Sequence, residues 1–452
     1  MTKGADINHR LDTSLKAMLA VSLPISLGYF IQFFIAFTDN FFCAKLSGNA
    51  MSAASFVGLI YITLVMVGIG LSNASQILVA RRKGEGRYAD VGAVVGNALW
   101  IGLFTACIQF VLLFVAIPPL LDAVISSDEV RVMMKEFLHY RAFGFFFYTL
   151  TLILQSFWSG IANTRVMMYS TFITALVNTV LAYALIFGKF GLPAMGLAGG
   201  AIASVVAEGC AFAFMILYTW FSRSQKEYAL NASLFSIDFK NVSSIFKLGL
   251  PISLQMMLAL GIWSVFYEFV EDMGEAPLQS SFIVRNMYSL VWVSVGGIGI
   301  CTKTYISGLI AEGRQSELRS VIKKLMLIDL TGVVLLSHGL WLYPRWIAAQ
   351  FSTDAVVIQQ TVDCMLIVLP AMLVFAFTSV MLAVLEGSGN ATKGFIVELI
   401  TTLAYIGAAY LMIYTWKWPI HLVWTADYIY FVVIGLLSMA FLWNGKWKYH
   451  KI

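Results

Sequence analysis

Charged side chains are scarce in this chain. Lysine, arginine, aspartate and glutamate make up 12% of its 452 residues, whereas an ordinary soluble domain carries about 25%. Apolar residues make up 60% of the chain, and the mean hydropathy is +0.83. So little polar surface excludes a water-soluble globule of this size and favours a protein that crosses a membrane several times.

Motifs for metal, nucleotide or enzyme chemistry are also missing. The five cysteines and five histidines are scattered, and no CxxC, HExxH or glycine-rich nucleotide loop is present. The first apolar run is too long for a signal peptide. We therefore expect no metal site, no cofactor and no enzymatic activity. The net charge of +5 comes from basic loops between apolar runs, so we expect no nucleic-acid partner.

Long apolar runs are what the chain does contain. A helix needs about 20 apolar residues to cross a bilayer, and about twelve segments have that length. The runs are continuously apolar, which favours helices over the alternating strands of a membrane barrel. The predicted spans are residues 17–44, 52–80, 91–118, 132–160, 167–188, 197–221, 247–271, 277–309, 322–343, 356–385, 394–415 and 420–443.

Basic residues are concentrated in alternate loops. They occur in "RRKGEGR" (81–87), "SRSQKE" (222–227), "EGRQSELRSVIKK" (312–324) and the tail "GKWKYHK" (445–451), whereas the intervening loops are poor in lysine and arginine. Loops rich in these residues stay in the cytoplasm. We therefore predict that both termini are cytoplasmic and that the protein lies in a plasma membrane of the bacterial inner-membrane type.

The two halves of the chain repeat one another. "LPISL" occurs at 23–27 and again at 250–254, 227 positions later. The same shift places "EGR" at 85–87 on "EGR" at 312–314, Gly70 on Gly297, and Gly160 on Gly387. The repeating unit has six spans, an even number, so both copies have the same orientation, as in parallel-repeat transporters. We predict an N-lobe at 1–221, a cytoplasmic linker at 222–246 and a C-lobe at 247–452.

Several motifs follow one another in a specific order. Pro24 and Asp39 lie fifteen residues apart in the first span, "VARRKGEGR" ends the second, "LQSFWSGIANTR" ends the fourth, and "LGLPISLQ" opens the seventh. This order resembles the MATE (multidrug and toxic compound extrusion) family of the MOP exporter superfamily. The resemblance covers nearly the whole chain. It implies a V-shaped pair of six-helix lobes that exports amphipathic solutes in exchange for protons or sodium ions.

The resemblance also implies a cation site in the N-lobe. Asp39 matches the family's aspartate in the first span, Asn178 its asparagine in the fifth, and Ser204 its threonine in the sixth. The family's aspartate of the fifth span is replaced by Ala182. The carboxylates that some members have in the C-lobe are also missing, with Ala259 and Ala376 at those positions.

Asp39 is the main candidate for coupling on the residues themselves. A carboxylate deep in an apolar helix costs several kcal/mol unless it is partnered, hydrated or protonated, so such a group can take a cation from one side and release it on the other. The alternative is a packing residue bonded to Asn178 or Thr38. Glu208 follows Ser204 by one helical turn. We hypothesise that Glu208 replaces the acid missing at residue 182; the alternative is a structural or snorkelling glutamate.

The C-lobe carries two cations within its eighth predicted span, Arg285 and Lys303. Buried charges are normally paired, so one interpretation pairs Arg285 with Glu268, and Lys303 with Asp329 or Glu398. The other interpretation is a positive wall that holds an anionic or zwitterionic substrate.

Three further residues complete the candidate set. Pro24 interrupts the hydrogen bonds of the first span and predicts a kink, which either bends during transport or is fixed. Phe147 and Trp158 are candidates to line a substrate cavity, because aromatic side chains suit flat amphiphiles.

We therefore predict a monomeric secondary-active exporter of small amphipathic substrates, surrounded by membrane lipid and driven by H⁺ or Na⁺. Two alternatives remain open: an exporter of anionic or zwitterionic metabolites, and a flippase for lipid-linked precursors. A channel is less consistent with the duplication, which favours alternating access.

Overall fold

The computed structural model describes residues 10–234 and 236–452 of the chain. Within this part, helices account for all regular secondary structure. Eleven of the described helices are long and apolar enough to cross a membrane, and a bent pair raises the number to twelve. The twelve predicted spans all fall on helices, although 132–160 and 277–309 are each divided between two consecutive helices. The chain is an all-α, multi-pass membrane protein with two lobes.

The described residues form two compact units. Unit 2 comprises Leu27–Ser253, and unit 1 combines the described residues up to Ser26 with Leu254–Ile452. The chain therefore passes between the units at two places, Ser26–Leu27 and Ser253–Leu254, which lie 227 positions apart like the sequence repeats. The division into lobes at 1–221 and 247–452 stays a prediction.

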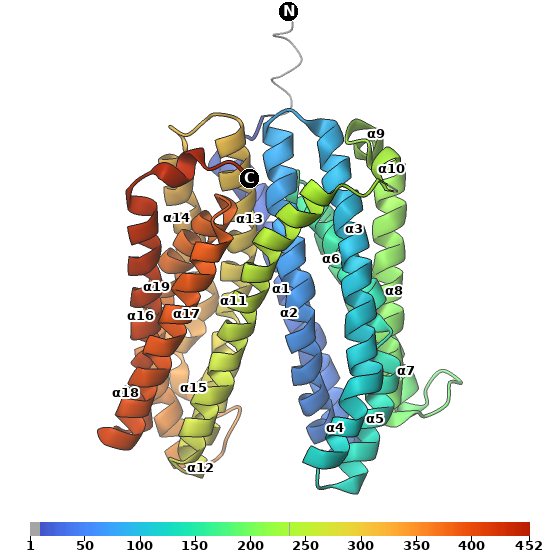
Figure 1. The fold of residues 1–452 in the computed structure, drawn as a ribbon. Helices are drawn as coiled ribbons and strands as arrows, with labels where there is room; N and C mark the ends of the chain where they lie inside the picture. Colours follow the sequence, from blue (N-terminus) through green and yellow to red (C-terminus); the bar gives the residue numbers. More distant parts are fainter. Residues whose placement is uncertain (1–9, 235) are drawn as a thin grey trace, which may run out of the picture. The chain divides into compact units, whose positions relative to one another are not determined.

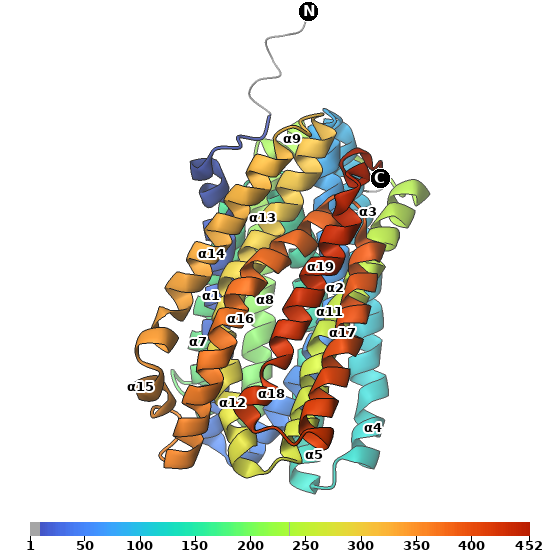
Figure 2. The ribbon, with the colours of Figure 1, turned by 90° about the vertical axis from the view of Figure 1, so that its left-hand side faces the viewer.

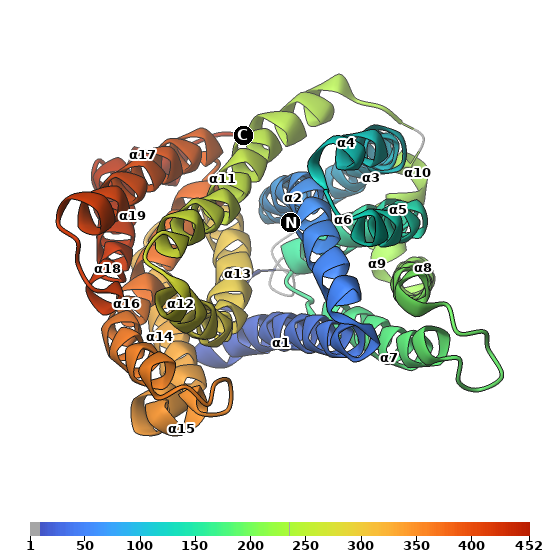
Figure 3. The ribbon, with the colours of Figure 1, turned by 90° about the horizontal axis from the view of Figure 1, so that it is seen from below.

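Unit 2 is a bundle around α6, which packs against α2, α3 and α8 (Figure 1, Figure 3). Its helices are the second part of α1 (Leu15–Leu46), α2 (Gly48–Gly84), α3 (Tyr88–Val111), α4 (Ile117–Val124), α5 (Asp128–Arg141), α6 (Gly144–Gly160), α7 (Arg165–Phe187), α8 (Gly196–Phe221), the short α9 (Ser224–Glu227) and α10 (Leu230–Ser233), and the start of α11 (Phe239–Glu271). A π-helical turn, η2 (Leu112–Ala116), joins α3 to α4.

Unit 1 is built in the same way around α16, which packs against α13, α14 and α19 (Figure 2). Its helices are the start of α1, the second part of α11, α12 (Glu275–Tyr288), α13 (Val291–Ala311), α14 (Leu318–Leu342), α15 (Pro344–Ala348), α16 (Ala355–Gly387), α17 (Ala391–Tyr410), α18 (Ile420–Val423) and α19 (Ala426–Trp443). A π-helical turn, η3 (Leu411–Thr415), extends α17, and a 3₁₀ turn, η4 (Lys446–Tyr449), follows α19.

Two glycine contacts repeat the 227-residue shift in three dimensions. In unit 2, a Cβ on Gly70 would lie 2.5 Å from the backbone nitrogen of Ser253. In unit 1, a Cβ on Gly297 would lie 2.9 Å from the backbone nitrogen of Ser26. Distances this short leave room only for a hydrogen at each position. The repeat read from the sequence is therefore also a repeat of helix packing.

The "EGR" motif of unit 1 holds the beginning of the described chain. The Leu11 nitrogen donates to Glu312 Oε1 at 2.9 Å, and Arg314 Nη1 donates to the Leu11 carbonyl at 2.7 Å. Thr13 donates its hydroxyl hydrogen to Glu317 Oε2 at 2.8 Å. Hydrogen bonds from Arg314 and Thr13 hold the pKa of Glu317 below its ordinary value. This N-terminal clasp places the start of α1 on the α13–α14 turn.

Candidate functional site

Asp39 lies in the second part of α1 and is half-buried in unit 2. Within the described part of the chain, no side chain comes within hydrogen-bonding distance of its carboxylate. Thr38 donates to the Ile35 carbonyl at 2.9 Å, and Asn178 donates its amide to Ser204 Oγ at 3.0 Å. The packing alternative, in which Asp39 bonds to Thr38 or Asn178, is therefore wrong for this structure.

A buried ion pair lies on the neighbouring helices of the same unit. Arg141, the last residue of α5, donates to both carboxylate oxygens of Glu208 on α8, at 2.6 and 2.8 Å. The two side chains are 12% and 8% exposed. The guanidinium carbon lies 3.7 Å from the centre of the Tyr61 ring. The pair is thus fixed on one side by two hydrogen bonds and on the other by a cation–π contact.

Glu208 is at mid-helix in α8, buried and paired. The interpretation as a snorkelling residue near the helix end is therefore wrong, whereas the buried pair with Arg141 is consistent with a structural glutamate. Ala182 belongs to a separate apolar cluster, with Ile186 and Ala203 among its buried members. A carboxylate at residue 182 would lie among these apolar side chains, whereas Glu208 lies beside a cation.

Asp39 is within electrostatic range of this pair, because the charges of Arg141 and Glu208 both act on it. Unit 2 therefore contains two carboxyl groups and one guanidinium in a largely apolar region. With both carboxyl groups ionised, one negative charge has no counter-ion in the cluster. We call Asp39, Arg141 and Glu208 the unit 2 charge cluster.

Arg141 is the member that sequence reasoning missed. It lies inside the predicted span 132–160, so its position in an apolar segment was a usable signal. The span is bent there: α5 and α6 meet at 48°. Gly144 follows the bend, and a Cβ at this position would overlap Arg141 Nη1 and Glu208 Oε2.

The predicted pair of Asn178 and Ser204 is brought together, as their hydrogen bond shows. Asn178 is 1% exposed. Its Oδ1 atom is buried and accepts no hydrogen bond from the described residues. An amide oxygen in this state is a possible ligand for a cation.

The two cations of unit 1 have different environments. Lys303 on α13 pairs with Glu386 on α16, with 2.8 Å between Nζ and Oε2. Gln255 Nε2 donates to the other oxygen of Glu386 at 2.9 Å. The predicted partners of Lys303 were wrong: Asp329 accepts from Ser294 at 2.7 Å.

Glu398, the other predicted partner of Lys303, accepts instead from the hydroxyl of Tyr430. Arg285 on α12 contacts two aromatic rings, Tyr267 at 5.2 Å and Trp263 at 5.8 Å. Among the described residues, no carboxylate lies within 4 Å of Arg285, so the predicted pair with Glu268 is not formed. The positive wall suggested by the sequence is reduced to Arg285, because Lys303 is neutralised.

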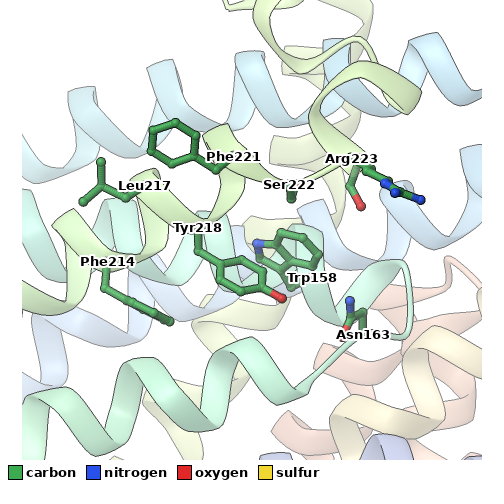
Figure 4. Close-up of a pocket in the computed structure, with 9 residues that line it drawn as sticks. Trp158, Asn163, Phe214, Leu217, Tyr218, Phe221, Ser222 and Arg223 are labelled. Carbon is green, nitrogen blue, oxygen red and sulfur yellow. The ribbon is translucent and has the colours of Figure 1, made fainter.

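The predicted aromatic residues do not share a site. Phe147 on α6 is half-buried against α8, where its ring centre lies 6.1 Å from that of Phe212. Trp158 is 1% exposed, and its Nε1 donates to Thr219 Oγ1 at 3.0 Å. Trp158 borders a pocket at the end of α8 (Figure 4).

No group of three or more histidine, cysteine, aspartate or glutamate side chains among residues 10–234 and 236–452 has the geometry to hold a metal ion.

Pro24, the predicted hinge, lies within α1 and just before the point where the chain passes from unit 1 to unit 2.

A family model, MatE, matches the chain twice, over residues 24–184 and 251–411. The second stretch is the first one shifted by 227 positions. The chain belongs to the MatE family. Members of this family are transporters, so the protein is a membrane transporter and not an enzyme.

Curated relatives span most of the chain. The probable multidrug resistance protein NorM of Thermotoga maritima is 23% identical over 96% of this chain and 93% of its own length. NorM of Rhizobium meliloti is 26% identical over 62% of this chain and 60% of its own length.

Solved structures have the same fold. A MOP superfamily transporter from Pyrococcus furiosus superimposes with a TM-score of 0.89 at 18% identity, over 97% of this chain and 96% of its own. The MATE transporter VcmN of Vibrio cholerae gives a TM-score of 0.86 at 16% identity, over 96% and 98%.

Proposed function

We propose that this protein is a secondary-active exporter. Its membership of the MatE family and the unit 2 charge cluster support this function. It moves amphipathic solutes outward in exchange for inward flow of H⁺ or Na⁺, by alternating access. The curated relatives are named multidrug resistance proteins, which supports a broad range of drug-like substrates. The protein acts as a monomer in a membrane of the bacterial inner-membrane type, with both termini in the cytoplasm.

The proposal rests on the one negative charge of the cluster that has no counter-ion. Arg141 neutralises Glu208 through two short hydrogen bonds, so the charge of Asp39 is left over. An uncompensated carboxylate within a membrane span is unfavourable by several kcal/mol. A proton or a sodium ion at Asp39 removes that penalty, and its release restores it. Asp39 is therefore the residue through which cation binding changes the energy of unit 2.

The other members of the predicted set have supporting roles. Glu208 supplies the second carboxyl group in place of the acid missing at residue 182, and Arg141 fixes its position. Asn178 and Ser204 form a polar pair whose free amide oxygen suits a cation. Pro24 precedes one of the two places where the chain passes between units. Because proline removes a helical hydrogen bond, α1 can bend there as the charge of Asp39 changes.

Transport by purified protein in sealed vesicles tests the proposal. A cationic dye is followed while a pH gradient or a sodium gradient is imposed, one at a time. We expect one gradient to drive accumulation in the wild type and neither to drive it in Asp39→Asn. Asp128→Asn, which removes an exposed acid at the start of α5, is the matched control and should transport normally. Gradient-driven transport by Asp39→Asn at the wild-type rate would refute the proposal.

Arg285 supports a second candidate function, export of an anionic or zwitterionic metabolite. Its guanidinium is held by aromatic rings and by no described carboxylate, so its charge is available to a substrate. Arg285→Gln should then abolish transport of acidic substrates and spare cationic ones, whereas Arg319→Gln, an exposed control in the same unit, should affect neither. Equal effects of Arg285→Gln on both substrate classes would exclude this candidate.

A further inference from the structure

The end of α8 contains a pocket that the transport mechanism does not use. It has a volume of about 560 Å³ and lies within unit 2, between the last two turns of α8, the end of α6 and the turn that follows α8. Lys83 at the end of α2 donates to the Ile161 carbonyl of the α6–α7 turn at 2.7 Å. The pocket therefore lies at the same end of unit 2 as the basic α2–α3 turn.

The floor of the pocket is rigid and aromatic. Trp158 is held by its hydrogen bond to Thr219. Its ring meets that of Tyr218 edge-to-face, with centroids 5.2 Å apart. Tyr218 in turn contacts Phe214, at a centroid distance of 5.8 Å. These contacts fix the shape of the floor without any ligand.

The wall of the pocket is apolar and open to the surroundings. Leu217 and Phe221 are four residues apart, so they share one face of α8, whereas Phe214 lies on the side of Tyr218 (Figure 4). Leu217 is 56% exposed and Phe221 is 82% exposed. In a membrane-spanning helix, such an exposed apolar wall faces acyl chains rather than water.

The rim of the pocket is cationic. Arg223 lies two residues beyond Phe221 and lines the pocket together with the polar turn that ends α8 (Figure 4). Among the described residues, no carboxylate is within 4 Å of Arg223. The nearest acid in sequence, Glu227, interacts with the hydroxyl of Tyr228. The positive charge at the rim is therefore not neutralised by the protein.

We propose that this pocket binds an anionic phospholipid, with its phosphate on Arg223 and the upper part of an acyl chain along Phe214, Leu217 and Phe221. An apolar wall that ends in an unpaired guanidinium is complementary to a lipid with an apolar acyl chain and an anionic headgroup. Arginine binds phosphate through two parallel hydrogen bonds, and clusters of basic residues next to a span attract anionic lipids. The aromatic floor is typical of residues at the membrane interface.

Lipid retention by the purified full-length protein tests this inference. Wild type and variants are titrated with phosphatidylglycerol or phosphatidylcholine in detergent, and bound lipid is counted by native mass spectrometry. Arg223→Gln should weaken phosphatidylglycerol binding about fivefold, the contribution of one basic side chain at an anionic lipid surface, and should leave phosphatidylcholine binding unchanged. Phe221→Ala should weaken the binding of both lipids.

Two controls make the test specific. Arg165→Gln removes an exposed arginine at the start of α7, outside the pocket, and should leave phosphatidylglycerol binding close to that of the wild type. Arg223→Lys keeps the charge and should retain most of the binding. Equal losses in Arg223→Gln and Arg165→Gln would show diffuse attraction and overturn the proposal.

One-for-one displacement of the lipid by an exported dye would also overturn the proposal, by making the pocket a substrate site. The inference does not depend on what the protein exports, so failure of the transport test leaves it intact.

Discussion

Replacing Glu208 by glutamine tests the charge cluster most sharply through stability. The change keeps the size of the side chain and removes its charge. Arg141 then loses both hydrogen bonds to a carboxylate and keeps the Tyr61 ring 3.7 Å from its guanidinium, while Asp39 stays in the cluster as an anion that is not hydrogen-bonded to it. A buried guanidinium without a hydrogen-bonded counter-ion is unfavourable, so we expect a large loss of stability.

The magnitude follows from the geometry of the pair. Removing one partner of a buried ion pair costs about 3–5 kcal/mol. The cation–π contact, worth up to about 2 kcal/mol when desolvated, survives the change, so we expect a loss near the lower limit, about 3 kcal/mol. Replacing both partners by apolar residues, as in Arg141→Met with Glu208→Leu, should bring stability back to within about 1 kcal/mol of the wild type.

Unfolding in detergent of the wild type, Arg141→Met, Glu208→Leu and the double variant completes a double-mutant cycle, and Glu208→Gln is measured beside it. We expect a coupling energy of about 2 kcal/mol or more. Glu129→Gln, which removes an exposed acid bonded to Asn49, is the control and should cost less than about 1 kcal/mol. If Glu208→Gln unfolds like the wild type, or if the double variant is as unstable as the sum of the singles, the pair is not a compensated buried pair.

Three further predictions concern packing and the N-terminal clasp. Gly144→Ala should cost about 1–3 kcal/mol, because its Cβ would separate the two partners of the pair, whereas Gly58→Ala, with no atom within 4 Å of its Cβ, should unfold like the wild type. Gly297→Ala should cost a similar amount, because its Cβ would meet the backbone of Ser26 at 2.9 Å. Glu317→Gln should lower the thermal midpoint at neutral pH. Because the pKa of Glu317 is lowered in the folded state, its contribution is present above the ordinary carboxyl pKa and disappears as the pH falls through the lowered value, so the two midpoints should converge in acid.

The spans and the repeat could be predicted because both depend on long segments. An apolar run of about 20 residues has few alternatives to a membrane helix. A shift that aligns several separate motifs is hard to produce by chance. The same shift reappears in the packing of Gly70 on Ser253 and of Gly297 on Ser26. The repeated glycines in the sequence therefore mark two places where helix backbones lie in close contact.

The partners of the buried charges could not be predicted. Helices that are apolar on all sides do not reveal which face points inward, so Lys303 was paired with Asp329 or Glu398 rather than with Glu386. The pair of Arg141 and Glu208 joins residues 67 positions apart, beyond any local pattern. The π-helical turn at Leu112–Ala116 is a different case, because Pro118 follows it and removes the helical hydrogen bond to the carbonyl of Phe114, four residues earlier.

The exchange of solute for a cation bound at Asp39 is tested most directly by ion release. Binding of a cationic dye to the purified wild-type protein, in weakly buffered detergent solution, should release protons if the coupling ion is H⁺, or displace bound sodium if it is Na⁺. The account predicts that Asp39→Asn binds the dye without releasing either ion. Ion release by Asp39→Asn equal to that of the wild type would contradict it.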